Sequence, residues 1–112
     1  MTEQLFSYGT LRQDDVQESL FGRTVPSVAD AIPGYRLEWL PITDPAVIAT
    51  SGSDRHPVLR RGTAADRVEG DRLAIDITEL AAADDYEVDD YIRIRVTLAS
   101  GVDAWVYVAG ND

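Results

Sequence analysis

Apolar residues that alternate with polar ones at a period of two form the strongest pattern in this chain, and that period predicts β-strands rather than helices. The Tyr91–Leu98 segment alternates through its middle, and the apolar segment Ala104–Val108 follows after the loop Ser100–Asp103. Two such segments joined by a short loop that contains glycine predict a β-hairpin. The same period within Val68–Ile77 predicts another strand.

Shorter apolar segments predict more strands in the first half of the chain. They are Leu5–Tyr8, Thr24–Ile32, Tyr35–Leu40 and Ala46–Ala49, with a weak strand around Val58 and Leu59. Pro26 lacks a backbone N–H, so the second of these strands should lie at a sheet edge or begin after this proline. Ser51–Arg61 is the most polar interior segment, and we expect a mobile surface loop before that weak strand, with His56 exposed.

Two segments carry the start and stop signals of short helices. The predicted helices are Val16–Phe21, capped by Asp14 or Asp15 and ended by Gly22, and Ile77 to about Tyr86, capped by Asp76. Asp76 stands three residues before Glu79, which is the spacing of a capping box. Strands therefore outnumber helices, and no strand–helix–strand alternation is present.

This set of elements predicts an α+β fold, a small mixed β-barrel or curved sheet with two short helices. The chain has 112 residues, so it fits a single domain over residues 1–112. Hydrophobic residues make up 45% of it and charged residues 27%, a balance that lets one domain form a core in water.

The composition excludes several kinds of chemistry. The chain has no cysteine, which rules out disulfides, a thiol nucleophile and zinc sites built on cysteine. Its one histidine, His56, cannot form a multi-histidine metal site. All ten basic residues are arginine, so neither a Schiff-base lysine nor a P-loop lysine is available.

Charge and hydropathy limit the partners and the location. The net charge of −10 should repel nucleic acid and anionic membranes, so we expect neither as a partner. No apolar run approaches the ~18 residues that a membrane span needs. Residues Met1–Gln4 carry no basic patch before an apolar core, so no signal peptide is predicted and the expected location is cytoplasmic.

The first strand ends in a sharp break that is the first candidate site. Gly9 follows Tyr8 and is poorly suited to continue a strand, and a polar stretch begins at Arg12. A tight turn at Gly9 and Thr10 can leave successive N–H groups pointing one way, and such a concavity binds small anions. The alternative is that Gly9 only supplies a turn with positive φ.

The second candidate site is the end of the predicted second helix. Leu80, Ala83 and Glu87 lie on one stripe of that helix, so a core-facing Leu80 carries Glu87 toward the interior. The neighbouring acids, Asp84 among them, are expected to fan into water. Burial raises the pKa of a carboxyl group, which would make Glu87 a general acid/base near neutral pH. Alternatively the helix ends at Asp85 and Glu87 is solvated.

Five segments together carry a family resemblance. In chain order they are Tyr8-Gly9-Thr10-Leu11, Pro33-Gly34-Tyr35-Arg36-Leu37, Asp84-Asp85-Tyr86-Glu87, Tyr91-Ile92-Arg93-Ile94-Arg95-Val96 and Ala104-Trp105-Val106-Tyr107-Val108. In this order they resemble the γ-glutamylcyclotransferase-like family, also called AIG2-like. The resemblance covers nearly the whole chain and implies a small mixed β-barrel with helices at its rim.

The resemblance also implies a reaction and a site. The reaction would release 5-oxoproline from a small γ-glutamyl compound and free the attached amine or amino acid. The turn Tyr8–Leu11 would hold the substrate carboxylate through backbone N–H groups, with Tyr8 at the mouth of the cavity. Glu87 matches the family's acid/base glutamate. Arg36 and Tyr107 are further cavity candidates, although an exposed charge and core packing account for them equally well.

The chemistry agrees with these roles. In a γ-glutamyl amide the α-amine and the side-chain carbonyl belong to one molecule, and well-oriented intramolecular attack is worth ~7–11 kcal/mol. The cyclisation then needs one base that takes a proton from the α-ammonium and returns it to the leaving amine. It needs no metal, no cofactor and no enzyme nucleophile.

Two positions depart from the family pattern. Ala83 stands where the family usually has a large apolar residue, and Val88 stands where glycine often follows the glutamate. Ala83 would enlarge the pocket, unless Trp39 or Trp105 fills the space. Val88 would alter how Glu87 enters the cavity.

Two other functions remain open at the level of sequence. The same cavity would serve a binding module that holds a small carboxylate without turnover. The other alternative is an interaction protein that keeps the barrel fold but no longer uses the cavity. Glu87 together with Gly9 favours the enzyme, because a binder needs no buried base. The amine that leaves and the oligomeric state are not specified.

Overall fold

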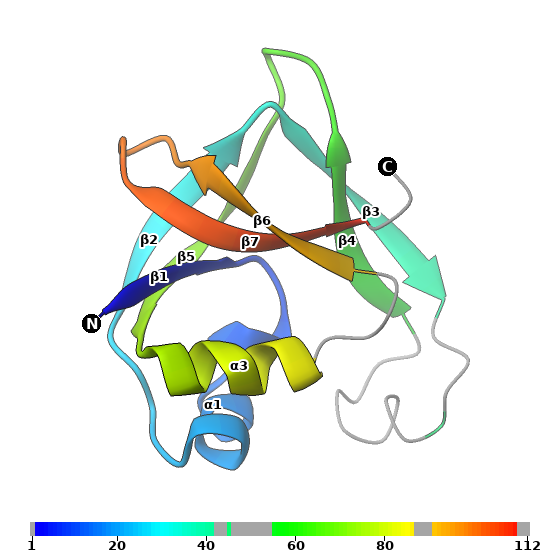
Figure 1. Cartoon of the computed structure of the whole chain (residues 1–112). Helices are drawn as coiled ribbons and strands as arrows, with labels where there is room; N and C mark the ends of the chain where they lie inside the picture. The colour runs from blue at the N-terminus through cyan, green and yellow to red at the C-terminus, as the bar shows by residue number, and fades with distance from the viewer. Residues whose placement is uncertain (1, 42–44, 46–54, 87–90, 110–112) are drawn as a thin grey trace.

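The computed structural model describes residues 2–41, 45, 55–86 and 91–109. The strands are β1 (Glu3–Ser7), β2 (Ser27–Pro33), β3 (Tyr35–Pro41), β4 (Arg55–Arg61), β5 (Arg67–Ile75), β6 (Tyr91–Thr97) and β7 (Asp103–Ala109). The helices are the 3₁₀ helix η1 (Thr10–Arg12) and the α-helices α1 (Asp14–Phe21) and α3 (Ile77–Tyr86). The predicted α+β class, with two short α-helices, is confirmed (Figure 1).

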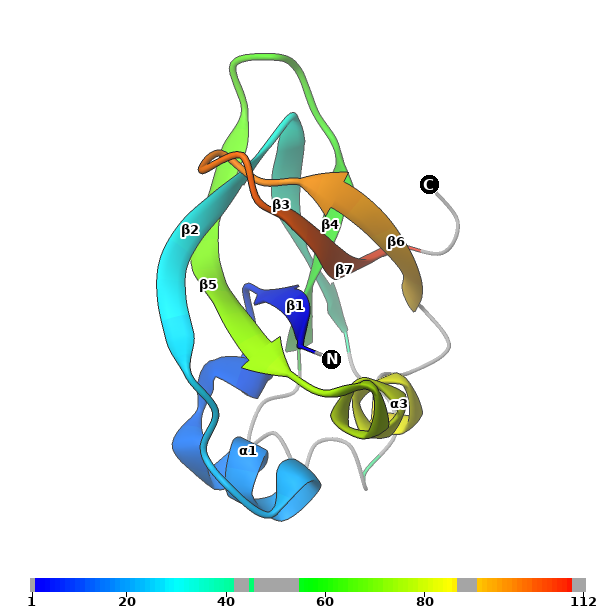
Figure 2. The ribbon, with the colours of Figure 1, turned by 60° about the vertical axis from the view of Figure 1, so that its left-hand side comes forward.

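The strands form two sheets. The five-stranded sheet has the order β2-β5-β1-β7-β6, and the two-stranded sheet pairs β3 with β4. All pairings are antiparallel except β1 with β7, where Leu5 lies beside Trp105. Within the described residues no strand pairing joins the two sheets, so they curve around a common interior without closing a hydrogen-bonded barrel (Figure 2).

Two cores lie on opposite faces of the five-stranded sheet, because successive strand side chains point to opposite faces. Leu5 belongs to the core under α1 and α3, and Phe6 belongs to the core between the sheet and the β3–β4 pair. On β7, Tyr107 faces the helices while Val106 faces the β3–β4 pair. The period of two in the sequence thus sets both cores.

The end of β1 approaches β5 closely at Gly70. A Cβ at this position would lie 2.3 Å from the Ser7 carbonyl oxygen, which is closer than real Cβ contacts occur. Glycine therefore allows the close approach of the end of β1 to β5.

Most predicted element boundaries are confirmed. Gly22 ends α1 in the left-handed conformation with φ 76°, and β2 is an edge strand that begins after Pro26. The capping box of α3 is present, since the Glu79 N–H donates to Asp76 Oδ1 at 2.7 Å and the Asp76 N–H donates to Glu79 Oε1 at 3.0 Å.

Three local predictions were wrong. α1 begins at Asp14, so Gln13 holds the cap position and neither Asp14 nor Asp15 caps the helix. The weak strand predicted around Val58 and Leu59 is confirmed, but the loop predicted before it was wrong from Arg55 onward. Arg55–Arg61 is a full strand, β4, because pairing with β3 and burial of its middle outweigh its polar ends. β5 ends at Ile75, and Ile77 lies exposed on α3.

The predicted strand Ala46–Ala49 and the start of the predicted loop, Ser51–Asp54, lie outside the described residues, as does the side chain of His56. In the part of the chain that the structure covers, no helix is long and apolar enough to cross a membrane.

Candidate functional site

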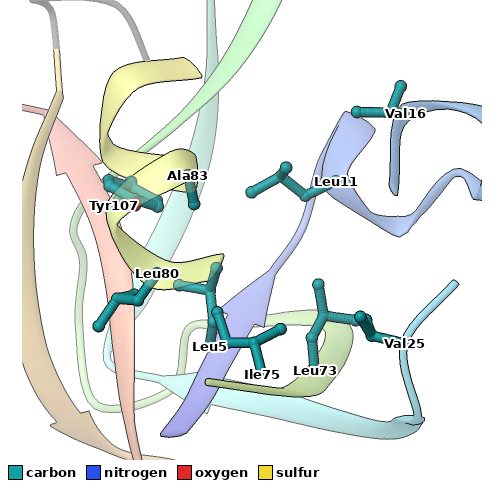
Figure 3. Packing of buried hydrophobic residues seen from close by; sticks show 9 residues of the cluster. All are labelled: Leu5, Leu11, Val16, Val25, Leu73, Ile75, Leu80, Ala83 and Tyr107. Atoms are coloured by element: carbon teal, nitrogen blue, oxygen red, sulfur yellow. The ribbon is translucent and has the colours of Figure 1, made fainter. Parts of the chain in front are cut away.

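The turn after β1 is built on the start of a 3₁₀ helix. Gly9 has φ −137° and ψ −144°, so it is not in the left-handed region. The alternative in which Gly9 only supplies a positive φ is therefore wrong. The chain then enters η1 at Thr10, and Leu11 places its side chain in the core beneath the helices (Figure 3).

Partners engage every carbonyl oxygen of the turn Tyr8–Leu11. Arg12 binds the Gly9 oxygen through its backbone N–H at 3.2 Å and its Nε at 3.3 Å, and its Nη2 reaches the Tyr8 oxygen at 3.4 Å. The Gln13 N–H donates to the Thr10 oxygen at 2.9 Å. The buried amide of Gln17 donates to the Leu11 oxygen at 2.8 Å.

The N–H groups of the same turn are engaged differently. The Gly9 N–H makes a long contact of 3.4 Å with Ser7 Oγ. The N–H groups of Thr10 and Leu11 donate to no acceptor within the described ranges. The turn thus presents two successive N–H donors, which is the feature that the predicted anion-binding turn requires.

A hydrogen bond joins this turn to the end of α3. Thr10 Oγ1 and Tyr86 Oη lie 2.9 Å apart, and Tyr86 is the last residue of α3. Leu80 and Ala83 face the core, which confirms the orientation predicted for this helix. Glu87, the next residue after Tyr86, lies outside the described residues.

A second route joins the turn to the same helix through β7. Tyr8 Oη donates to the Tyr107 carbonyl oxygen at 2.5 Å, and Tyr107 Oη donates to Asp84 Oδ1 at 2.7 Å. The ring of Tyr107 is buried beside Ala83, where the small alanine side chain leaves room for it (Figure 3). Tyr107 is thus both a core residue and a hydrogen-bond partner of the site elements.

Asp84 is exposed as predicted, with 39% of its side-chain surface accessible, but its carboxylate is also bound. Arg93 binds it with two nitrogen atoms, Nε at 2.8 Å from Oδ1 and Nη2 at 3.1 Å from Oδ2. With the hydrogen bond from Tyr107, three polar contacts hold this carboxylate. The sequence did not predict these partners, because they come from β6 and β7, which helical spacing cannot reveal.

The remaining candidate residues lie elsewhere. Arg36 is exposed on β3 and forms an ion pair of 2.8 Å with Glu38 of the same strand. Trp39 is 57% exposed, so it does not fill the space beside Ala83, whereas Trp105 packs partly against that core. No group of three or more residues able to hold a metal occurs in the described ranges.

Three residues of the site were missed as functional elements by sequence reasoning. They are Arg12 and Gln17, which hold the carbonyl side of the turn, and Asp84. The only signal for Asp84 is its place in the Asp84-Asp85-Tyr86-Glu87 segment, and nothing in the spacing of Arg12 or Gln17 marks them.

A model of the family described as γ-glutamyl cyclotransferase, AIG2-like, matches residues 5–112. The chain belongs to this family. The match contains both the turn and α3, so the resemblance of the five sequence segments is confirmed. Among proteins with a curated description, none matches the sequence.

Solved structures show the same fold at low sequence identity. An Arabidopsis thaliana protein solved in solution has a TM-score of 0.79 at 22% identity, over 99% of this chain and 64% of that protein. A γ-glutamyl cyclotransferase has a TM-score of 0.73 at 12% identity, over 97% of this chain and 67% of its own. An uncharacterised Pyrococcus horikoshii protein has a TM-score of 0.64 at 18% identity, over 98% of this chain and 80% of that protein. This family member therefore spans about two thirds of the first two structures.

Proposed function

We propose that this family member is a γ-glutamyl cyclotransferase that releases 5-oxoproline and a free amine or amino acid from a small γ-glutamyl compound. The observation that carries the proposal is the Thr10–Tyr86 hydrogen bond. It ties a turn with two open N–H groups to the residue directly before Glu87. A carboxylate-binding turn and a carboxylic acid/base are the two parts that the cyclisation needs.

In this proposal the turn Tyr8–Leu11 binds the α-carboxylate of the substrate. The N–H groups of Thr10 and Leu11 are the donors. Arg12 and the Gln13 N–H orient the same two peptide groups by holding the Gly9 and Thr10 carbonyl oxygens. Hydrogen bonds from backbone N–H groups to a charged carboxylate are stronger than bonds between neutral groups. A substrate carboxylate fixed there orients the neighbouring α-amine.

Glu87 acts in this proposal as the general acid/base. The α-ammonium loses a proton to the glutamate, and the amine attacks the side-chain carbonyl carbon to form a five-membered ring. The bond between that carbon and the leaving nitrogen then breaks. Both protons lost by the α-nitrogen end on the leaving nitrogen, which departs as an ammonium, so no water is consumed and Glu87 is regenerated.

The test measures 5-oxoproline release from a panel of γ-glutamyl amides that differ in the amine. The wild type should release 5-oxoproline from at least one amide, and Glu87→Gln should release none, because an amide cannot take the proton. N-acetylated γ-glutamyl amides serve as the matched substrate control and should give no product, since their α-nitrogen cannot attack.

Other results have distinct meanings. Release by both proteins would keep the reaction and remove Glu87 from its role. No release by a folded wild type that still binds glutamate-like carboxylates would favour a non-catalytic binding module in the same site. The panel also names the amine, which the fold does not specify.

A further inference from the structure

We propose that Asp84 is a positioning residue, whose carboxylate holds the last turn of α3 against the Tyr8–Leu11 turn. It acts through Tyr107 and Arg93 and does not touch the substrate. The inference rests on the proposed function, because its consequence is the direction in which the chain leaves α3 toward Glu87.

The contacts of Asp84 fix its carboxylate from two strands. Oδ1 accepts a hydrogen bond from Tyr107 Oη at 2.7 Å and Oδ2 accepts one from Arg93 Nη2 at 3.1 Å, while Arg93 Nε forms an ion pair with Oδ1 at 2.8 Å. A forked arginine–carboxylate pair restricts orientation as well as distance. Helix α3 is therefore held at this residue to both β6 and β7.

The two strand residues are themselves restrained. The Arg93 guanidinium lies 4.4 Å from the ring centroid of Trp105, a stacked arrangement that limits its rotation. The ring of Tyr107 is buried in the core under α3. Asp84 thus binds to groups that have few other positions.

Helix stability does not explain a carboxylate at this place. The last turn of α3 carries Asp84 and Asp85 and no basic residue. Negative charge is unfavourable at the C-terminal end of a helix, where the peptide dipoles leave partial negative charge. The partners on β6 and β7 offset that cost. The contacts of Asp84 therefore hold the helix end to the sheet, although the charge itself is unfavourable for the helix.

The same helix end is attached to the turn at two points. Tyr86 binds Thr10 directly, and Asp84 reaches Tyr8 by way of Tyr107, whose hydroxyl group binds Asp84 while its carbonyl group binds Tyr8. Helix ends fray when they have few tertiary contacts. Two attachments, on residues 84 and 86, restrain both the position and the rotation of the final turn.

The chain offers a matched control in Asp85. Like Asp84 it is exposed, but its side chain makes no hydrogen bond or ion pair with another described residue. Asp84→Asn and Asp85→Asn remove the same charge from the same helix turn. Any difference in kcat between the two variants therefore results from the contacts of Asp84.

The experiment measures kcat and KM for 5-oxoproline release by the wild type and both variants, with urea unfolding to give the folded fraction. Asp84→Asn should lower kcat per folded molecule about 10- to 100-fold, because a displacement near 1 Å of a reacting group costs about 10²-fold. Its KM should change little, since the turn that binds the carboxylate keeps its N–H groups. Asp85→Asn should match the wild type.

Tyr107→Phe supplies a second variant that removes one hydrogen bond of Asp84 and retains the buried ring. It should lower kcat less than Asp84→Asn, and the double variant should lose no more than Asp84→Asn alone, because both act through one contact. If Asp84→Asn does not fold, the comparison of Tyr107→Phe with Asp85→Asn decides the proposal in the same way.

Three results would overturn the inference. Equal kcat in Asp84→Asn and Asp85→Asn would do so, as would a loss explained entirely by the unfolded fraction. Additive losses in the double variant would show that Tyr107 and Asp84 act separately. No release by the folded wild type would instead refute the proposed function, and the positioning role with it.

Discussion

The two ends of α3 are held by different kinds of interaction. At its N-terminal end Asp76 and Glu79, three residues apart, satisfy each other's backbone N–H groups. At its C-terminal end the partners of Asp84 and Tyr86 lie on β6, on β7 and in the turn after β1, and Thr10 is 76 residues from Tyr86. One end is closed by local spacing, and the other is closed by the tertiary fold.

We expect the two ends of α3 to serve different purposes, the first mainly stability and the second mainly turnover. The N-terminal end contributes mainly to folding, since Arg23 adds two charge-assisted bonds of 2.8 and 2.9 Å to Glu79. The C-terminal end lies beside the open N–H groups of the turn. We therefore expect damage to the first end to lower stability and damage to the second to lower turnover.

Glu79→Ala should have the largest effect. It removes a buried carboxylate, one half of the capping box and the Arg23 pair, so the free energy of unfolding should fall by about 3 kcal/mol. Glu18→Ala, at an exposed position of α1, is the matched control and should stay within about 0.5 kcal/mol of the wild type. Urea unfolding measures both. A fall in kcat per folded molecule in Glu79→Ala would contradict the separation of the two ends.

Thr10→Pro should lower kcat/KM by about 10- to 100-fold, because a hydrogen bond to a charged group is worth about 1.5–3 kcal/mol. Proline is tolerated at the first residue of a helix, so the variant removes chiefly the Thr10 N–H and the hydroxyl bond to Tyr86. Thr10→Ala loses the same bond to Tyr86 and keeps the N–H. Equal kcat/KM in the two variants would show that this N–H does not bind substrate.

The smallest expected effect is the pH dependence of stability at the N-terminal end. Hydrogen bonds from Arg23 lower the pKa of Glu79, against the opposing effect of burial, from its ordinary value of 4.5. Because the folded-state pKa is lowered, the stabilisation is complete above pH 4.5 and is lost as the pH falls through the lower folded value. The free energy of unfolding, measured with urea, should therefore fall more steeply on acidification in the wild type than in Glu79→Gln. The glutamine keeps a capping amide and does not titrate. If the free energy of unfolding changed with pH in the same way in both proteins, the ionisation of Glu79 would not contribute to stability.

Local features of the chain were predictable because they depend on residues a few positions apart. The period of two in Tyr91–Leu98 and the glycine-containing loop after it predict the β6–β7 hairpin, and the Asp76–Glu79 spacing predicts the start of α3. The break at Gly9 places the turn, and the ordered set of five segments identifies the family. Sterics, side-chain direction and capping bonds act at this range, so one sequence is enough to find them.

Only the tertiary structure decided which distant segments meet. β1 lies between β5 and β7, and it runs parallel to β7, an arrangement that no local pattern of Leu5 or Trp105 indicates. The arginine and tyrosine on Asp84 and the fixed carbonyl groups of the turn depend on that arrangement. Contacts of this kind are set by the packing of the whole chain, whose free energy is summed over many residues and cannot be read from the spacing of a few.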